Sequence, residues 1–148
     1  MKRIVIAYDG SDGSREALEQ GLELARTARA VATLVYVRHG PLPIVGDPFY
    51  ERALSRELQR GRDVLVEARL YAAAASVVSE TELLEGDAAE QILDLARLRD
   101  AELIVVGSRG RGAIAEALLG SVSAAVVHGA DRPVLVARPR ARRERRAA

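Results

Sequence analysis

The stretch that most constrains the fold is LIVVGSRGRGAIAEALLGSVS, residues Leu103–Ser123. It begins with an unbroken apolar run, Leu103–Val106, and the lack of alternation is typical of a strand buried on both faces of a sheet. A loop rich in glycine follows, with Gly107, Gly110, Gly112 and Gly120. A helical pattern then begins at Ser121 and runs to Gly129. The stretch therefore predicts a buried strand, a glycine-rich loop and a helix in succession.

Such a loop can hold an anion, because backbone N–H groups converge where a glycine-rich turn meets the start of a helix. Glycine lacks a Cβ atom, so the backbone can adopt positive φ angles and approach a phosphate closely. Ser121 adds a hydroxyl at the helix N-terminus, where the helix dipole favours negative charge. The alternative is a long connecting loop in which glycine only turns the chain and Ser121 is a simple cap.

The rest of the chain alternates between predicted strands and predicted helices. The expected strands are Arg3–Tyr8, Val31–Val37, Val77–Leu84, Leu103–Val106 and Val134–Ala137. The expected helices run from the polar turn at residues 9–14 to Arg29, over Phe49–Ser76, from Gly86-Asp87 to about Arg99, and over Ser121–Gly129. Gly61 is expected to weaken or bend the long second helix. This order predicts an α/β fold with a mostly parallel sheet, whose mixed third strand lies at an edge.

Composition narrows the class of protein. At 148 residues with 49% apolar side chains, the chain is expected to form one globular domain. No apolar run approaches the length of a membrane span. The absence of cysteine excludes disulfides, thiolate metal sites and cysteine nucleophiles, and makes the cytoplasm the default location. One Phe and four Tyr are too few for aromatic platforms that stack single-stranded nucleic acid.

The charge is unevenly distributed along the chain. Residues 138–148 hold six arginines and one glutamate, a net charge of +5, whereas the whole chain has +1, so the remainder has −4. We expect residues 1–138 to form the domain and residues 139–148 to form a basic, disordered tail. A contact of the tail with RNA, an anionic lipid or a partner protein is the alternative, although nucleic acid is not the favoured partner.

The glycine spacing resembles a known signature. Gly107, two residues, Gly110, nine residues and then Gly120-Ser121 match the nucleotide-binding pattern of the universal stress protein family. The opening IVIAYDGSDGSREAL is similar to that family's first strand and turn, and DRPVLVA is similar to its last strand. The resemblance covers roughly residues 1–138. It implies an adenine-nucleotide alpha-hydrolase-like fold, in which an open five-stranded parallel sheet of order 3-2-1-4-5 carries helices on both faces.

In that strand order the direction of winding reverses between strands 1 and 4, and ligands of open α/β sheets bind at such a reversal. Asp9 follows strand 1 and Gly107 ends strand 4, so the two motifs converge on one crevice. Asp9 could accept hydrogen bonds from a ribose or help to hold a metal ion, or it could only cap the first helix or tie down the turn. The resemblance implies a binding site made of Ala7, Asp9, Val37, Val106, Gly107, Arg109, Gly110, Gly120, Ser121, Val122 and Ser123.

The resemblance also implies what each part of this site does. Ala7 and Asp9 would border the adenosine, and Val37 would flank the base. Residues 106–110 would lie under the phosphates, and residues 120–123 would close over them.

One departure from the family bears on catalysis. Many members have a histidine where this chain has Arg109, and an arginine can grip a phosphate but cannot act as a general base. His39 and His128 stand apart from other ligand-type residues, so no catalytic residue is assigned. Any turnover of ATP is expected to be slow and assisted by a metal such as Mg or Mn.

The leading interpretation is a cytoplasmic universal stress protein that binds ATP or a related adenine nucleotide and acts in stress response or regulation. The resemblance implies a homodimer through the last strand, Val134–Ala137, although the arginines beyond it could instead protect that edge. The alternatives are an interaction protein of the same fold that binds no nucleotide, a weak ATP hydrolase, and a nucleic-acid binder that acts through the tail.

Overall fold

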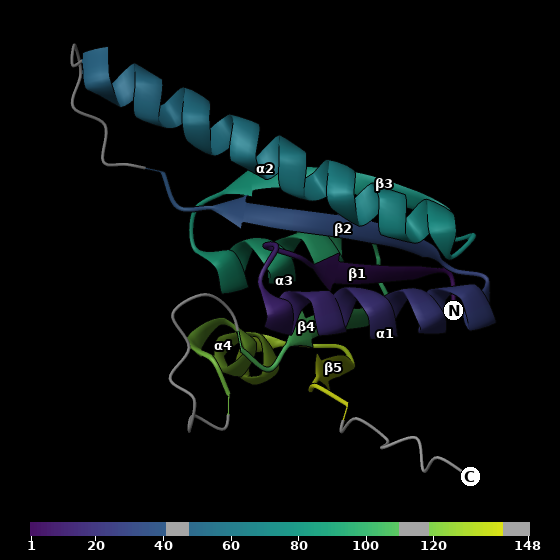
Figure 1. Ribbon diagram of the computed structural model, residues 1–148. Helices are drawn as coiled ribbons and strands as arrows, with labels where there is room; N and C mark the ends of the chain where they lie inside the picture. The colour runs from purple at the N-terminus through teal and green to yellow at the C-terminus, as the bar shows by residue number, and fades with distance from the viewer. Residues whose placement is uncertain (41–47, 110–118, 141–148) are drawn as a thin grey trace, which may run out of the picture.

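The computed structural model describes residues 1–40, 48–109 and 119–140, and its strands and helices alternate along the chain (Figure 1). The elements in order are β1 (Arg3–Ala7), α1 (Asp12–Ala28), β2 (Val31–Arg38), α2 (Pro48–Ala74), β3 (Ser79–Glu85), α3 (Ala88–Leu98), β4 (Leu103–Gly107), α4 (Ser121–Gly129) and β5 (Val134–Ala137). The α/β class that the sequence predicts is confirmed.

The five strands form one sheet in the order β3-β2-β1-β4-β5, and every neighbouring pair is parallel. The central strand β1 pairs with β2 on one side and with β4 on the other, so that Ile4 lies between Ala32 and Leu103. The predicted order is therefore confirmed, and β3 and β5 are the two edges. The winding reverses between β1 and β4, where the sequence places its two glycine-containing motifs.

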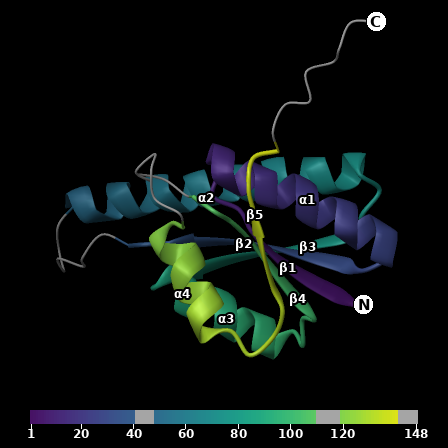
Figure 2. The same cartoon turned by 90° about the horizontal axis from the view of Figure 1, so that it is seen from below.

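Helices cover both faces of the sheet, as predicted (Figure 2). On one face α1 and α2 pack against side chains such as Ile4, Ile6 and Leu34. On the other face α3 packs with α4 against Val5, Val35 and Ile104. Adjacent residues of β1 point to opposite faces, and Ile4, Val5 and Ile6 are all fully buried, which explains the unbroken apolar run in the sequence. Burying each such side chain contributes about 1.5–3 kcal/mol.

The helix ends follow from local side-chain chemistry. Ser11 is the N-cap of α1, and its hydroxyl accepts a hydrogen bond of 3.3 Å from the Ser14 amide. Asp87 caps α3 in the same way, with 3.0 Å from its carboxylate to the Glu90 amide. Arg29 ends α1 in the left-handed conformation, with φ of 53°. The polar turn at residues 9–14 therefore supplies a helix cap, as the sequence predicts.

The predicted start of the third strand is two residues early. Val77 and Val78 look like strand residues because they are β-branched, but β3 begins at Ser79. The Val77 amide instead donates 2.9 Å to the carbonyl of Ala72, and Ser76 has a φ of 57°, so Ser76 and Val77 belong to the C-terminal cap of α2. Val78 is the transition residue, because its carbonyl accepts 2.9 Å from the Ala32 amide of β2. At Val77 the capping bond therefore overrides the β-propensity of the side chain. The other boundaries differ from prediction by one or two residues.

Gly61 has a packing role that the sequence does not reveal. Helix α2 is continuous from Pro48 to Ala74, and Gly61 lies on its buried face. A Cβ atom at this position would lie 2.6 Å from Cδ1 of Leu83 and 3.0 Å from Cδ1 of Tyr36. The glycine therefore lets α2 approach β2 and β3 closely.

Candidate functional site

A cleft of about 630 Å³ lies at the carboxyl ends of β1, β2 and β4. This volume is within the range of about 300–1,000 Å³ that is usual for small-molecule sites. Ten of the eleven residues that the sequence predicts for the site line this cleft: Ala7, Asp9, Val37, Val106, Gly107, Arg109, Gly120, Ser121, Val122 and Ser123. The eleventh, Gly110, lies outside the described residues. The chain therefore brings its two separate motifs together at the winding reversal.

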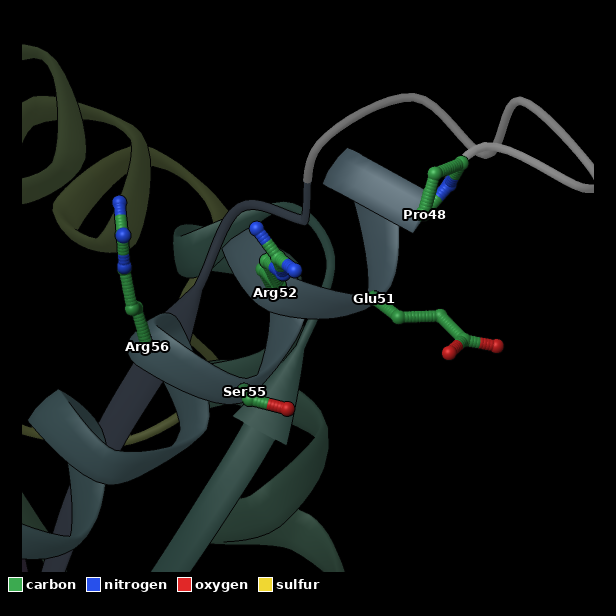
Figure 3. Close-up of a pocket in the computed structure, with 5 residues that line it drawn as sticks. All are labelled: Pro48, Glu51, Arg52, Ser55 and Arg56. Atoms are coloured by element: carbon green, nitrogen blue, oxygen red, sulfur yellow. The ribbon is translucent and has the colours of Figure 1, made fainter.

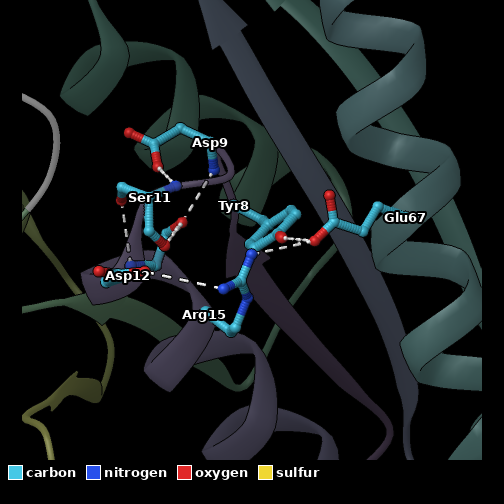
Figure 4. Close-up of polar contacts among 7 residues, drawn as sticks. Tyr8, Asp9, Ser11, Asp12, Arg15 and Glu67 are labelled. Atoms are coloured by element: carbon cyan, nitrogen blue, oxygen red, sulfur yellow. Dashed lines mark hydrogen bonds and ion pairs between the residues drawn. The ribbon is translucent and has the colours of Figure 1, made fainter.

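The turn after β1 is held by hydrogen bonds of its own (Figure 4). The Asp9 carboxylate accepts 2.9 Å from the Ser11 amide, and the Asp9 amide donates 3.2 Å to Oγ of Ser14. The Ser14 hydroxyl in turn donates 3.0 Å to the carbonyl of Ser11. Asp9 thus ties down the turn, as one of the two alternatives predicts, while Ser11 caps the helix. One carboxylate oxygen, Oδ1, is used in this bond, and the residue still lines the cleft.

Two glycines allow the backbone of this turn to touch the end of β4. A Cβ atom on Gly107 would lie 2.6 Å from the carbonyl carbon of Gly13 and closer still to its oxygen. A Cβ atom on Gly13 would overlap the carbonyl group of Arg109. The backbone contact therefore requires glycine on both sides, and it fixes how the β1–α1 turn and the β4 end are placed at the floor of the cleft.

The N-terminus of α4 presents backbone donors on another wall. Gly120 is the N-cap residue and supplies no side-chain cap, so Ser121 is the first helical residue and not the cap. The first amide of the helix to find a helical acceptor is that of Ala124, which donates 3.0 Å to the carbonyl of Gly120. The amides at 121, 122 and 123 precede it, and amides in this position have no acceptor within their own helix. Together with the helix dipole, they favour an anion at this wall.

Ser123 holds the start of α4 in place through hydrogen bonds to backbone carbonyls. Its buried hydroxyl lies 3.0 Å from the carbonyl of Gly120 and 3.3 Å from that of Ser108. The Gly120 amide also donates 2.6 Å to the Ser108 carbonyl. Ser123 therefore orients the start of α4 rather than presenting a free hydroxyl.

An apolar wall lies on the α3 side of the cleft. It consists of Ala7, Val35, Val37, Ala88, Ile92 and Val106. Ala88 and Ile92 come from α3, and the sequence analysis did not assign them to the site. Their spacing along the helix predicts that both face the core. Only the packing of α3 against the sheet shows that this part of the helix face also lines the cleft.

Polar and charged side chains line the cleft from the end of β2 and from α2. Arg38, His39, Glu57 and Arg60 are all additions to the predicted site. Nη2 of Arg38 pairs with Glu85 at 2.7 Å, whereas its Nη1 lies 3.6 Å from Oε2 of Glu57, too far for a hydrogen bond. The Arg38 side chain is only 10% exposed, so water screens its charge weakly. The two nearby carboxylates therefore neutralise most of its positive charge. Arg109 and Arg60 are exposed and remain available to an anionic ligand.

Beneath the turn lies a polar cluster made of Tyr8, Glu67 and Arg15 (Figure 4). The Tyr8 hydroxyl donates 2.6 Å to Oε1 of Glu67, and Nη2 of Arg15 donates 3.2 Å to the same oxygen. Burial of the phenol and its bond to the carboxylate raise the pKa of Tyr8 to about 12. The phenol therefore stays protonated and acts as a fixed hydrogen-bond donor.

A second hollow lies along the first turns of α2 (Figure 3). It is lined by Pro48, Glu51, Arg52, Ser55 and Arg56, all from this one helix. Because the described residues give it no wall from a second element and no apolar side chain beyond the proline, it is a weaker candidate than the cleft.

Three further findings concern metals, membranes and the tail. Within residues 1–40, 48–109 and 119–140, no three His, Asp or Glu side chains gather closely enough to hold a metal ion. Over the same described ranges, no helix has the length and apolarity needed to cross a bilayer. The tail begins beside α1, where Nη2 of Arg140 pairs with Glu23 at 2.7 Å and Gln20 donates 3.0 Å to the Arg138 carbonyl. Residues 141–148 of the predicted tail lie outside the described part of the chain.

The chain is similar to known proteins in both sequence and structure. Residues 1–138 match the universal stress protein family. A universal stress protein of Thermus aquaticus is 40% identical over 138 residues, which cover 93% of this chain and 98% of that protein. The structure of universal stress protein UspA from Lactobacillus plantarum aligns with a TM-score of 0.83 at 25% identity, over 93% of this chain and 97% of that one.

A universal stress protein solved in complex with cAMP aligns with a TM-score of 0.68 at 26% identity, over 93% of this chain and 97% of that chain. The adenine-nucleotide alpha-hydrolase-like fold predicted from the sequence is the fold that these solved structures share with the chain.

Proposed function

The chain belongs to the universal stress protein family, and we propose that it binds an adenine nucleotide, with ATP as the first candidate, in the cleft at the carboxyl ends of its strands. The observation that carries this proposal is the pairing of two unlike walls in one cleft. Ala7, Val37 and Ile92 belong to an apolar wall, whereas the amides at the start of α4 offer an anion site. A nucleotide has the matching parts, a flat base at one end and phosphates at the other.

In this proposal the base lies against Val37 and the apolar wall, and the ribose lies beside Asp9. The phosphates lie between Arg109 and the N-terminus of α4, where a guanidinium and free amides both favour negative charge. The relative that was solved with cAMP supports an adenine ligand for this kind of cleft. We choose ATP rather than a monophosphate or a cyclic nucleotide because the site offers two groups that favour negative charge. These are Arg109 and the N-terminus of α4, and together they suit more than one phosphate.

A divalent ion, Mg²⁺ or Mn²⁺, would take most of its ligands from the phosphates and water in this site. Asp9 and Glu57 are the carboxylates that line the described cleft, and Oδ1 of Asp9 already accepts the Ser11 amide. A phosphate-bound Mg²⁺ commonly needs only one or two protein carboxylates, so Asp9 fits as a single ligand. The ion would neutralise phosphate charge and so strengthen binding.

We assign binding rather than hydrolysis to this cleft. Arg109 is permanently charged and cannot remove a proton from water. His39 lines the cleft from the end of β2, on the side that we assign to the base and not to the phosphates. We further propose that the protein acts in the cytoplasm as a nucleotide-regulated stress-response protein, as a homodimer through the exposed edge of β5.

The proposal is tested by two linked measurements on the full chain. Freshly purified protein is denatured and any released nucleotide is identified by mass spectrometry. Nucleotide-free protein is then titrated calorimetrically with ATP, with and without Mg²⁺, with AMP and cAMP, and with GTP as the control for base recognition. Released ATP, or saturable ATP binding that GTP does not match, supports the proposal. Failure of ATP, AMP and cAMP to bind would contradict it and would favour an interaction protein of the same fold.

A further inference from the structure

We propose that Glu67, which is not among the described residues lining the cleft, sets the nucleotide affinity of the site by holding Tyr8 and Arg15 in place. This inference rests on the proposed nucleotide binding and assigns Glu67 as a positioning residue. Tyr8 is the residue directly before Asp9, and Arg15 lies in the first turn of α1. The two therefore stand at the two ends of the turn that carries Asp9 into the cleft.

In this contact one carboxylate oxygen serves both donors (Figure 4). Oε1 of Glu67 accepts 2.6 Å from the Tyr8 hydroxyl and 3.2 Å from Nη2 of Arg15. The carboxylate comes from α2, whereas the donors come from the end of β1 and from α1. A single side chain thus joins three elements directly beneath the turn.

Neither donor has an equivalent substitute for Glu67. The Tyr8 residue is 1% exposed, so water has little access to replace the carboxylate as the acceptor of its hydroxyl. The other described carboxylate near Arg15 is Asp12, which lies 3.7 Å from Nη1 and is fully exposed. Nε of Arg15 is buried and has no hydrogen-bond partner among the described residues. The position of both side chains therefore depends on Glu67.

The cluster connects two walls of the cleft. The same helix that carries Glu67 also supplies Arg60 and Glu57 to the cleft, about two and three turns earlier. The hydrogen bonds of Glu67 hold this helix against the turn of Asp9. Without them, the turn retains its internal bonds but is no longer tied to α2, so Asp9 is less firmly positioned. A nucleotide whose ribose lies beside Asp9 then binds more weakly, because binding must order the turn.

The test is a double-mutant cycle in the full chain with ATP affinity as the readout. Tyr8→Phe removes the donor without changing the shape of the ring, and Glu67→Gln removes the charge without changing the size of the side chain. Glu51→Gln is the matched control, because it makes the same chemical change on an exposed position of the same helix. Thermal unfolding and circular dichroism are recorded for each protein, so that affinity is compared only among folded proteins.

We expect each single substitution in the cluster to weaken ATP binding by about threefold to tenfold, which corresponds to the net contribution of one ordinary hydrogen bond. The double variant is expected to lose less affinity than the product of the two single effects, because both changes act on the Tyr8–Glu67 contact. Glu51→Gln is expected to bind as the wild type does. A purely structural role would lower the melting temperature of the variants and leave their ATP affinity unchanged.

The inference is overturned if both single variants bind ATP within about twofold of the wild type, or if their effects multiply in the double variant. Wild-type protein that binds no adenine nucleotide would instead overturn the proposed function, and this inference with it. The wild-type titration therefore distinguishes the two failures. As a spectroscopic check, tyrosine-ring NMR should show that Glu67→Gln lowers the pKa of Tyr8, because the bond to the carboxylate helps to raise it.

Discussion

Replacing Gly107 with alanine tests the backbone contact that forms the floor of the cleft. The added Cβ atom would lie 2.6 Å from the carbonyl carbon of Gly13 and 3.1 Å from the amide nitrogen of Ser14. These are backbone atoms of the β1–α1 turn, so relief requires movement of the turn or of the end of β4. Overpacking of a well-packed site costs about 1–3 kcal/mol, and we expect the upper part of this range because no flexible side chain can give way.

The assay is urea unfolding of wild type, Gly107→Ala and the control Gly129→Ala, followed by ATP titration of the folded variants. At Gly129 the added Cβ atom would meet only Cδ1 of Leu93, at 2.8 Å, which is the end of a flexible side chain. We expect Gly107→Ala to unfold at about 1–2 M less urea, given the usual urea dependence of small domains, and to lose ATP affinity. We expect the control to stay within about 1 kcal/mol of the wild type. A Gly107→Ala protein that is as stable as the control would refute the close backbone contact.

Three further predictions use other features of the molecule. Arg109→Gln should weaken ATP binding by about tenfold or more, because it removes a charged donor to phosphate, and equal calorimetric affinities would remove Arg109 from the site. The folded-state pKa of Tyr8 lies above its ordinary value of 10.0, so the stability due to the neutral phenol is present below that value and is lost as the pH rises toward about 12. Urea midpoints should therefore fall more steeply with pH above 10 in the wild type than in Tyr8→Phe, and parallel curves would contradict this. Arg132→Met should destabilise the protein by about 1–3 kcal/mol in urea unfolding, because Nη1 of Arg132 donates 2.9 Å to the carbonyl of Ala96 and 2.8 Å to that of Ala101, while an unchanged midpoint would show that water replaces these bonds.

Much of the fold could be predicted because local and global signals agree in this chain. The apolar runs Ile4–Ile6 and Leu103–Val106 mark central strands that are buried on both faces, and this is where the sheet places them. The glycine spacing could be interpreted because family resemblance gives the order of the strands, and that order brings Asp9 and Gly107 to one end of the sheet. The prediction of the site thus depended on topology as much as on the motif.

The contacts of α2 could not be predicted from its sequence. Gly61 looks like a weak point of a long helix, yet its function in packing depends on Leu83 and Tyr36, which come from other elements. Glu67 looks like one of many charged residues on the exposed face of the same helix. Its bond to Tyr8 spans 59 residues of sequence, and no periodicity or spacing encodes such a pair. Long-range polar contacts of this kind require the packed structure.

The central claim is that an adenine nucleotide binds between the apolar wall and the N-terminus of α4. The most direct test is ATP titration followed by backbone amide NMR on isotope-labelled full-length protein. We expect the largest shifts at the amides of Ser121, Val122 and Ser123 and around Asp9, with smaller shifts at Val37. Shifts confined to the hollow along α2 or to the arginine tail, with the amides of α4 unmoved, would contradict it.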